Sequence, residues 1–123
     1  MKKMILNFTT SGAGAASASG ERAVLGKLYA VEYNPAATSN ATIVLTCLEA
    51  GAVSKPLLTK TGAGAADVWF YPRDIPHGVE DGAVLTAAAG GDRVMPLMAG
   101  IPTLAVTSGG ATLTGRIVLY FEV

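Results

Sequence analysis

The residues best able to do chemistry lie between Asp74 and Asp81, in the sequence DIPHGVED, which contains the only histidine, His77. Zinc normally takes several His or Cys ligands, and this chain has one residue of each type. The spacing of a calcium EF-hand loop is also absent. Asp74 and Glu80 could form the acid–base pair of a glycosidase, but any β protein with nine carboxylates offers such pairs. We therefore predict a solvated acidic loop, with no metal, no cofactor and no enzymatic activity.

Two further features resemble reactive sites only superficially. Cys47 lies in the apolar segment 43–48 (IVLTCL), which predicts a buried, inert thiol. The segment 11–20 (SGAGAASASG) is rich in glycine, but no Lys-Ser or Lys-Thr pair follows it as in a P-loop. Its glycine spacing does not match the dinucleotide-binding fingerprint either. We expect a flexible surface loop there.

The segment 68–73 (VWFYPR) is the densest aromatic cluster of the chain. In a strand, Val68 and Phe70 would point to one side and Trp69 and Tyr71 to the other. Trp, Tyr and Arg are enriched at the centres of protein interfaces, which makes this segment, with Arg73, a candidate contact site. The alternative is that Trp69 fills the core and Tyr71 covers its edge.

The composition narrows the class of partner. Half of the residues are apolar, 15% are charged, and the net charge is zero, a balance that favours association over repulsion between molecules. The alternative is that Gly and Ala inflate the apolar fraction without forming apolar patches. Scattered basic residues argue against direct nucleic-acid binding. No apolar run approaches the roughly 20 residues that span a bilayer, and 4–8 is too short for a secretory signal, so we expect cytoplasmic synthesis and no membrane partner.

The elements that must position these residues are strands. Short runs rich in Val, Ile, Leu, Thr and Tyr alternate with Gly, Ala and Ser, and no stretch has a convincing amphipathic helical pattern. This pattern predicts a single all-β domain over 1–123, an antiparallel β-sandwich that is jelly-roll-like, with an immunoglobulin-like sandwich as the alternative. We read 1–10 as a first strand or an extended N-terminal arm and 11–20 as a flexible loop. The remaining predicted strands are 22–33, 42–48, 56–60, 68–73, 82–87, 93–98, 103–107 and 111–123.

Alternation predicts which side chains face the core. In 22–33 the purer apolar face carries Val24, Leu28 and Ala30, so Tyr29 and Tyr33 are expected to face outward. Ser108-Gly109-Gly110 predicts a hairpin between the last two strands. The last strand alternates well enough to lie at the centre of a sheet, with Leu113, Gly115, Ile117, Leu119, Phe121 and Val123 inward.

From 68–73 onward the chain resembles a known class. The string DVWFYPR, the polar loop after it and the terminal Tyr120-Phe121-Glu122 resemble small virion structural proteins of tailed bacteriophages, which are similar to capsid decoration (cement) proteins. The resemblance extends over most of the chain from Gly26. It implies a homo-oligomer, with a trimer favoured, that binds the major capsid protein across capsomers and strengthens the head. It also implies location in the virion after synthesis in the host bacterial cytoplasm.

Two other functions stay open: a head–tail connector, tail or fibre-base component, and a carbohydrate-binding β-sandwich in which Trp69 and Tyr71 stack on sugars. An extended N-terminal segment could also add a strand to a neighbouring sheet. The candidate partner-contact residues are Met4, Ile5, Leu6, Phe8, Tyr29, Tyr33, Trp69, Tyr71 and Arg73.

Overall fold

The computed structural model describes residues 1–35, 40–48, 55–73, 94–108, 110 and 113–123. Within these ranges the chain forms eight strands, paired antiparallel, and no helix. The all-β, antiparallel prediction is confirmed. The predicted acidic loop around His77 and the predicted strand at 82–87 lie outside the described residues. The strands are β1 (Lys2–Thr9), β2 (Ala16–Ser19), β3 (Val24–Pro35), β4 (Thr42–Leu48), β5 (Lys55–Lys60), β6 (Val68–Phe70), β7 (Leu97–Thr107) and β8 (Thr114–Glu122).

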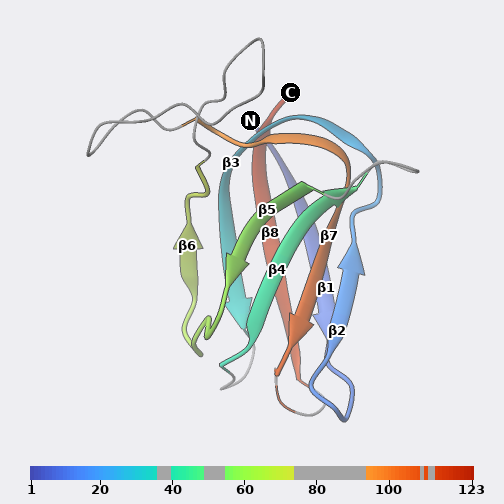
Figure 1. The fold of residues 1–123 in the computed structure, drawn as a ribbon, viewed down its shortest axis with the longest axis vertical. Helices are drawn as coiled ribbons and strands as arrows, with labels where there is room; N and C mark the ends of the chain where they lie inside the picture. The colour runs from blue at the N-terminus through green and yellow to red at the C-terminus, as the bar shows by residue number, and fades with distance from the viewer. Residues whose placement is uncertain (36–39, 49–54, 74–93, 109, 111–112) are drawn as a thin grey trace.

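The strands follow the order β1-β8-β3-β7-β4-β5, with β6 paired to β3 and β2 paired to β7 (Figure 1). Strand β7 joins two groups, because residues 97–100 pair with β3 and residues 101–107 pair with β4. At the changeover, Gly100 has a φ of 119°, a conformation that glycine adopts without the strain that a Cβ would add. One group therefore contains β1, β8, β3 and β6, and the other contains β2, β7, β4 and β5.

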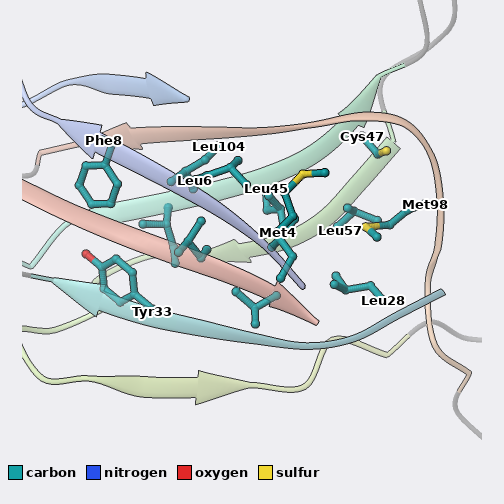
Figure 2. Packing of buried hydrophobic residues seen from close by; sticks show 14 of the residues in the cluster. Met4, Leu6, Phe8, Leu28, Tyr33, Leu45, Cys47, Leu57, Met98 and Leu104 are labelled. Atoms are coloured by element: carbon teal, nitrogen blue, oxygen red, sulfur yellow. The ribbon is translucent and has the colours of Figure 1, made fainter. Parts of the chain in front are cut away.

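A single apolar core takes side chains from both groups (Figure 2). The predicted burial of Cys47 is confirmed, and Ile43 and Leu45, which alternate with it along β4, are buried as well. In β8 the prediction is confirmed for its central residues and wrong for Val123, which is exposed at the chain end. The largest fully buried side chains are Tyr33, Phe121, Leu6, Leu28, Ile43, Leu45, Met98, Leu104, Ile117, Leu119, Val31 and Val106.

The N-terminal segment is a strand of this chain's own sheet. Strand β1 pairs with β8 in one unbroken register, from Lys2 opposite Phe121 to Thr9 opposite Thr114. Of the two roles expected for 1–10, the structure has the first strand rather than the arm. The segment 11–20 is also not wholly a loop, because Ala16–Ser19 pairs with β7 as β2. Strand pairing uses backbone groups, so small Ala and Ser side chains do not prevent it.

The predicted inward face of β3 is correct only for its first half. Val24 and Leu28 are buried as expected, but Tyr33 is 1% exposed, and its predicted outward position is wrong. The reason is a β-bulge: Leu28 pairs with Phe121 and Ala30 with Tyr120, so Tyr29 is an extra residue. An extra residue reverses which alternate side chains face the core from that point on.

The predicted hairpin at 108–110 is wrong. Strand β7 pairs with β2, β3 and β4, whereas β8 pairs with β1 and β3, so these consecutive strands are not hydrogen-bonded to each other. The end of β7 pairs in one strand group, and β8 pairs in the other. The central position predicted for the last strand is confirmed, since β8 lies between β1 and β3.

Candidate binding surface

An aromatic cluster covers the outward face of β3, β6 and β8. Register places Trp69 of β6 opposite Glu32 of β3, and Tyr120 of β8 opposite Ala30 of β3. Directly opposed residues of antiparallel strands share a face of the sheet, so these side chains lie on one side. We call this cluster the aromatic surface; its members are Tyr29, Trp69, Tyr71, Arg73 and Tyr120.

Trp69 is the central ring of the aromatic surface. Its ring centroid lies 5.2 Å from that of Tyr120, with an angle of 30° between the planes. It lies 6.5 Å from the centroid of Tyr71, with the planes at 17°. Tyr71 in turn meets Tyr29 edge to face, with centroids 6.3 Å apart and planes at 85°. Offset-stacked and edge-to-face pairs at these distances are favourable, so the rings hold one another in place.

Arg73 ties the segment after β6 to the bulge in β3. Its Nη1 atom donates hydrogen bonds to the carbonyl oxygens of Tyr29 at 2.9 Å and Pro72 at 2.6 Å. The guanidinium carbon also lies 5.5 Å from the centre of the Tyr29 ring, within the range of a cation–π contact. Arg73 therefore lies in the same cluster as Trp69 and Tyr71, because it contacts Tyr29 and Tyr29 contacts Tyr71.

Beneath the rings lie small and medium apolar residues that are separate from the main core. Ala30 and Val118 are 1% and 3% exposed, yet neither belongs to the core cluster. Val118 lies opposite Glu32, whose Oε1 accepts a hydrogen bond from the Tyr120 hydroxyl at 3.4 Å. Ala30 lies opposite Tyr120, and its side chain is only a methyl group. This small side chain leaves room for the Trp69 ring beside the Tyr120 ring.

The bulge explains why Tyr29 belongs to this surface. A bulge places two consecutive residues on the same side of a strand, and here these are Tyr29 and Ala30. The charges of β3 contain a sequence signal for it. Lys27 and Glu32 are an odd number of positions apart, so on a regular strand one of them would face the core. Both can face outward only if the strand contains an extra residue between them.

The aromatic surface is exposed. Trp69 is 46% exposed, Tyr71 56% and Tyr29 40%, which leaves large apolar areas open to a partner. Among the described residues, no group of three or more His, Cys, Asp or Glu side chains could hold a metal ion. In the part of the chain that the structure describes, no helix has the length and apolarity to cross a membrane.

Five predicted contact residues are not members of the aromatic surface, and four of them are buried. Met4, Leu6 and Phe8 are buried on the inward face of β1, and Tyr33 is buried on β3, so these four belong to the core. Burial raises the pKa of the Tyr33 hydroxyl above its ordinary value. Ile5 is 39% exposed on the outward face of β1, opposite Val118, so it lies on the same face of the sheet as the aromatic surface but is not one of its members. Sequence reasoning assigned no contact role to Tyr120 or Glu32, although alternation in the last strand already placed Tyr120 outward.

A groove of about 430 Å³ lies at the end of β1 and β8 where Thr9 and Thr114 pair. Opposite charges from Asp67 and Arg116 line it, and the Arg116 Nε atom donates to Asn34 Oδ1 at 3.1 Å. The described residues that line it are Asn7, Phe8, Thr9, Asn34, Pro35, Asp67, Thr114, Gly115 and Arg116.

Comparison of the chain with protein-family models, with curated proteins and with solved structures gives no match. The function is therefore inferred from the aromatic surface and from the sequence pattern.

Proposed function

We propose that this chain is a structural protein of a bacteriophage virion, a decoration protein that binds the major capsid protein across capsomers. The observation that carries the proposal is the aromatic surface, which presents Trp69, Tyr71 and Tyr29 on paired strands. The resemblance of DVWFYPR and of the Tyr-Phe-Glu end to phage virion proteins supplies the class of partner.

The geometry suits adhesion for a physical reason. Trp and Tyr provide large contact areas with few rotatable bonds, so little side-chain entropy is lost when they bind. Ring stacking and the hydrogen bonds from Arg73 order the site before a partner arrives, which lowers the cost of association further. Zero net charge adds no long-range repulsion between this chain and an assembled shell.

We further propose that the two strand groups form a β-sandwich of the jelly-roll type, with an immunoglobulin-like sandwich as the alternative. The support is the single core to which both groups contribute. A rigid sandwich would hold the aromatic surface in one orientation relative to a shell.

The test uses capsids assembled from the major capsid protein of the same genome. Purified chain is mixed with these capsids, and the bound fraction is measured by co-sedimentation. We expect Trp69→Ala and Tyr71→Ala each to weaken binding about 30-fold, as for an interface hot spot of about 2 kcal/mol. The matched control is Ile101→Ala, because Ile101 is also an exposed apolar residue, 42% accessible, but lies on β7 outside the aromatic surface.

Each outcome of the capsid experiment is informative. Unchanged binding by both aromatic variants, with the far-ultraviolet circular dichroism of the native fold, would remove the aromatic surface from the proposal. Absence of binding by the unmodified chain would overturn the decoration function. Counting copies in virions separates the remaining alternatives, since a decoration protein approaches the copy number of the capsid subunit and a connector or tail component does not.

Carbohydrate binding is the second candidate. The observation that favours it is the near-parallel arrangement of Trp69 and Tyr71, whose exposed rings could stack on a sugar. Since Trp69 is the only tryptophan, its fluorescence reports directly on an occupied site. Saturable quenching by an oligosaccharide, lost in Tyr71→Ala, would favour this function over capsid decoration.

A further inference from the structure

Strand β1 is the longest edge strand among the described strands. It is the terminal strand of the path and pairs only with β8, although β2 of the other strand group lies near it. Natural edge strands are normally shortened, bulged, broken by proline or charged, above all with lysine, because open N–H and C=O groups recruit another strand. The eight residues of β1 contain neither a proline nor a bulge, and Lys2 and Lys3 charge only its first two positions.

The other described edges carry such protection. Strand β5, at the opposite end of the path, contains Pro56 and a register shift at Leu57. Strands β2 and β6 have four and three residues, too few for a long ladder. A groove of about 190 Å³ beside β1, lined by Lys3, Met4, Ile5, Glu21 and Arg22, leaves open space next to its first half.

The hydrogen-bond register tells which residues of β1 face the open edge. The Thr10 N–H donates to the Leu113 carbonyl at 2.7 Å, continuing the β1–β8 pairing by one position. Backbone groups of successive residues in a strand point to opposite edges, so the even-numbered residues bond to β8. The N–H and C=O groups of Lys3, Ile5, Asn7 and Thr9 are then directed to the open edge.

We propose that β1 is a self-association site, at which β1 of a second copy of this chain pairs antiparallel around a two-fold axis at Ile5. In this register Ile5 faces Ile5 of the second copy and Lys3 faces Asn7. The odd-numbered residues then form the hydrogen-bonded pairs of the new ladder, as the direction of their N–H and C=O groups requires. Inward-facing Met4 lies opposite Leu6, so both buried faces continue across the junction.

Charge selects the antiparallel over the parallel orientation of the second copy. Lys2 and Lys3 are the only charges of β1, and the antiparallel register places each opposite Phe8 or Asn7 rather than opposite its own counterpart. Parallel pairing in register would set lysine against lysine, which is unfavourable between opposed strand positions. Two-fold symmetry is also the commonest symmetry of soluble homo-oligomers.

Charge exchange at Ile5 tests both the site and its register. Sedimentation equilibrium of the full chain over a range of concentrations should show monomers and dimers. Ile5→Lys and Ile5→Glu should each weaken the dimer about fivefold or more, because like charges would meet at the two-fold axis. An equimolar mixture of the two variants should recover dimers, since lysine then faces glutamate.

A backbone variant isolates the contribution of the ladder. Ile5→Pro removes an N–H that points away from β8, so the β1–β8 bonds remain and self-association should be lost. Ile5→Val keeps the N–H and should dimerise like the unmodified chain, which makes it the control. Circular dichroism verifies that every variant is folded.

Several results would overturn the proposal. These are a chain that is monomeric at all concentrations, a trimer, or dimers of Ile5→Lys and Ile5→Glu as stable as the unmodified dimer. Capsid binding enters none of these measurements, so failure here is separate from failure of the decoration function.

Discussion

Two tyrosines of β3 show how much the surroundings of a residue matter. Tyr29 and Tyr33 lie on the same face of an ideal strand, but Tyr29 is 40% exposed and Tyr33 is 1% exposed. The bulge at Tyr29 separates them by changing which residues face inward. Tyr29 thereby joins the aromatic surface, and Tyr33 becomes one of the largest side chains in the core.

Burial of Tyr33 predicts a loss of stability at alkaline pH. Below pH 10 the hydroxyl is protonated in the folded and the unfolded chain, so its ionisation does not affect stability. Above the ordinary pKa of 10.0 the unfolded chain releases the proton while the folded chain, whose pKa is raised, retains it. The free energy of unfolding then falls by about 1.4 kcal/mol for each pH unit between the two pKa values.

Tyr33→Phe should remove this particular loss. The two proteins differ only at residue 33, so the difference between the two denaturant-unfolding curves isolates Tyr33. We expect the two free energies of unfolding to differ by a constant amount below pH 10. Above it the difference should change in favour of the variant, and a difference that stays constant there would contradict the prediction.

At the scale of elements, the bulge in β3 joins two regular halves of the strand in which opposite alternate positions face the core. Before it, Val24 and Leu28 face the core; after it, Val31 and Tyr33 do. The residue pattern requires one extra position between the halves, and Tyr29 supplies it. The same logic applies to β5, where a register shift at Leu57 accompanies Pro56 on an edge strand.

Deleting one residue of β3 distinguishes the bulge from its regular neighbours. Removal of Tyr29 leaves Leu28, Val31 and Tyr33 facing inward, so the variant should fold and unfold cooperatively. Removal of Val31 also removes the extra residue and keeps Tyr33 inward, but it places Ala30 in the core position of Val31. Losing the burial of a valine side chain costs about 2 kcal/mol, a large part of the roughly 5–15 kcal/mol that stabilises a domain.

Urea unfolding followed by circular dichroism measures both deletions. Both deletions should retain a sigmoidal transition, and the Val31 deletion should unfold at a lower urea concentration than the Tyr29 deletion. Equal destabilisation by the two deletions would mean that Tyr29 is not the extra residue of β3.

At the scale of the whole molecule, β7 makes the two strand groups one unit. It pairs with β3 in one group and with β2 and β4 in the other, and both groups bury side chains in one core. Neither group keeps a covered apolar face without the other. The chain should therefore unfold in a single two-state transition, as small domains with one core usually do.

Trp69 fluorescence and a Gly100 variant test whether the chain unfolds in a single transition. Trp69 fluorescence reports on β6, and circular dichroism reports on all strands, so their unfolding transitions should coincide. Gly100→Ala places a Cβ at a φ of 119°, a strain of about 1–3 kcal/mol, and should lower both midpoints together. Gly12→Ala is the control, because a Cβ there meets nothing within 4 Å. Separate transitions, or a shift in only one signal, would contradict a single folding unit.

The sequence by itself determined the class of fold and most of the strands. Alternation and turn residues are local signals, and they located β1, β4, β5, β6 and β8. They also placed Trp69 and Tyr71 on one side of a strand, but only the structure decided that this side is exposed. Strand β2 escaped prediction because its pairing with β7 depends on backbone groups rather than on side-chain type.

Only the tertiary structure decided which of these strands meet and which residues share a surface. The hairpin prediction was wrong because β7 and β8 pair with strands that are distant in the sequence. The outward position predicted for Tyr33 was wrong because the bulge before it depends on pairing with the partner strand β8. Tyr29, Trp69, Arg73 and Tyr120 are far apart in the chain and form one surface through the β6–β3–β8 pairing. Register between strands is a long-range property, whereas alternation along a strand is a local one, and this difference separates what could be predicted from what could not.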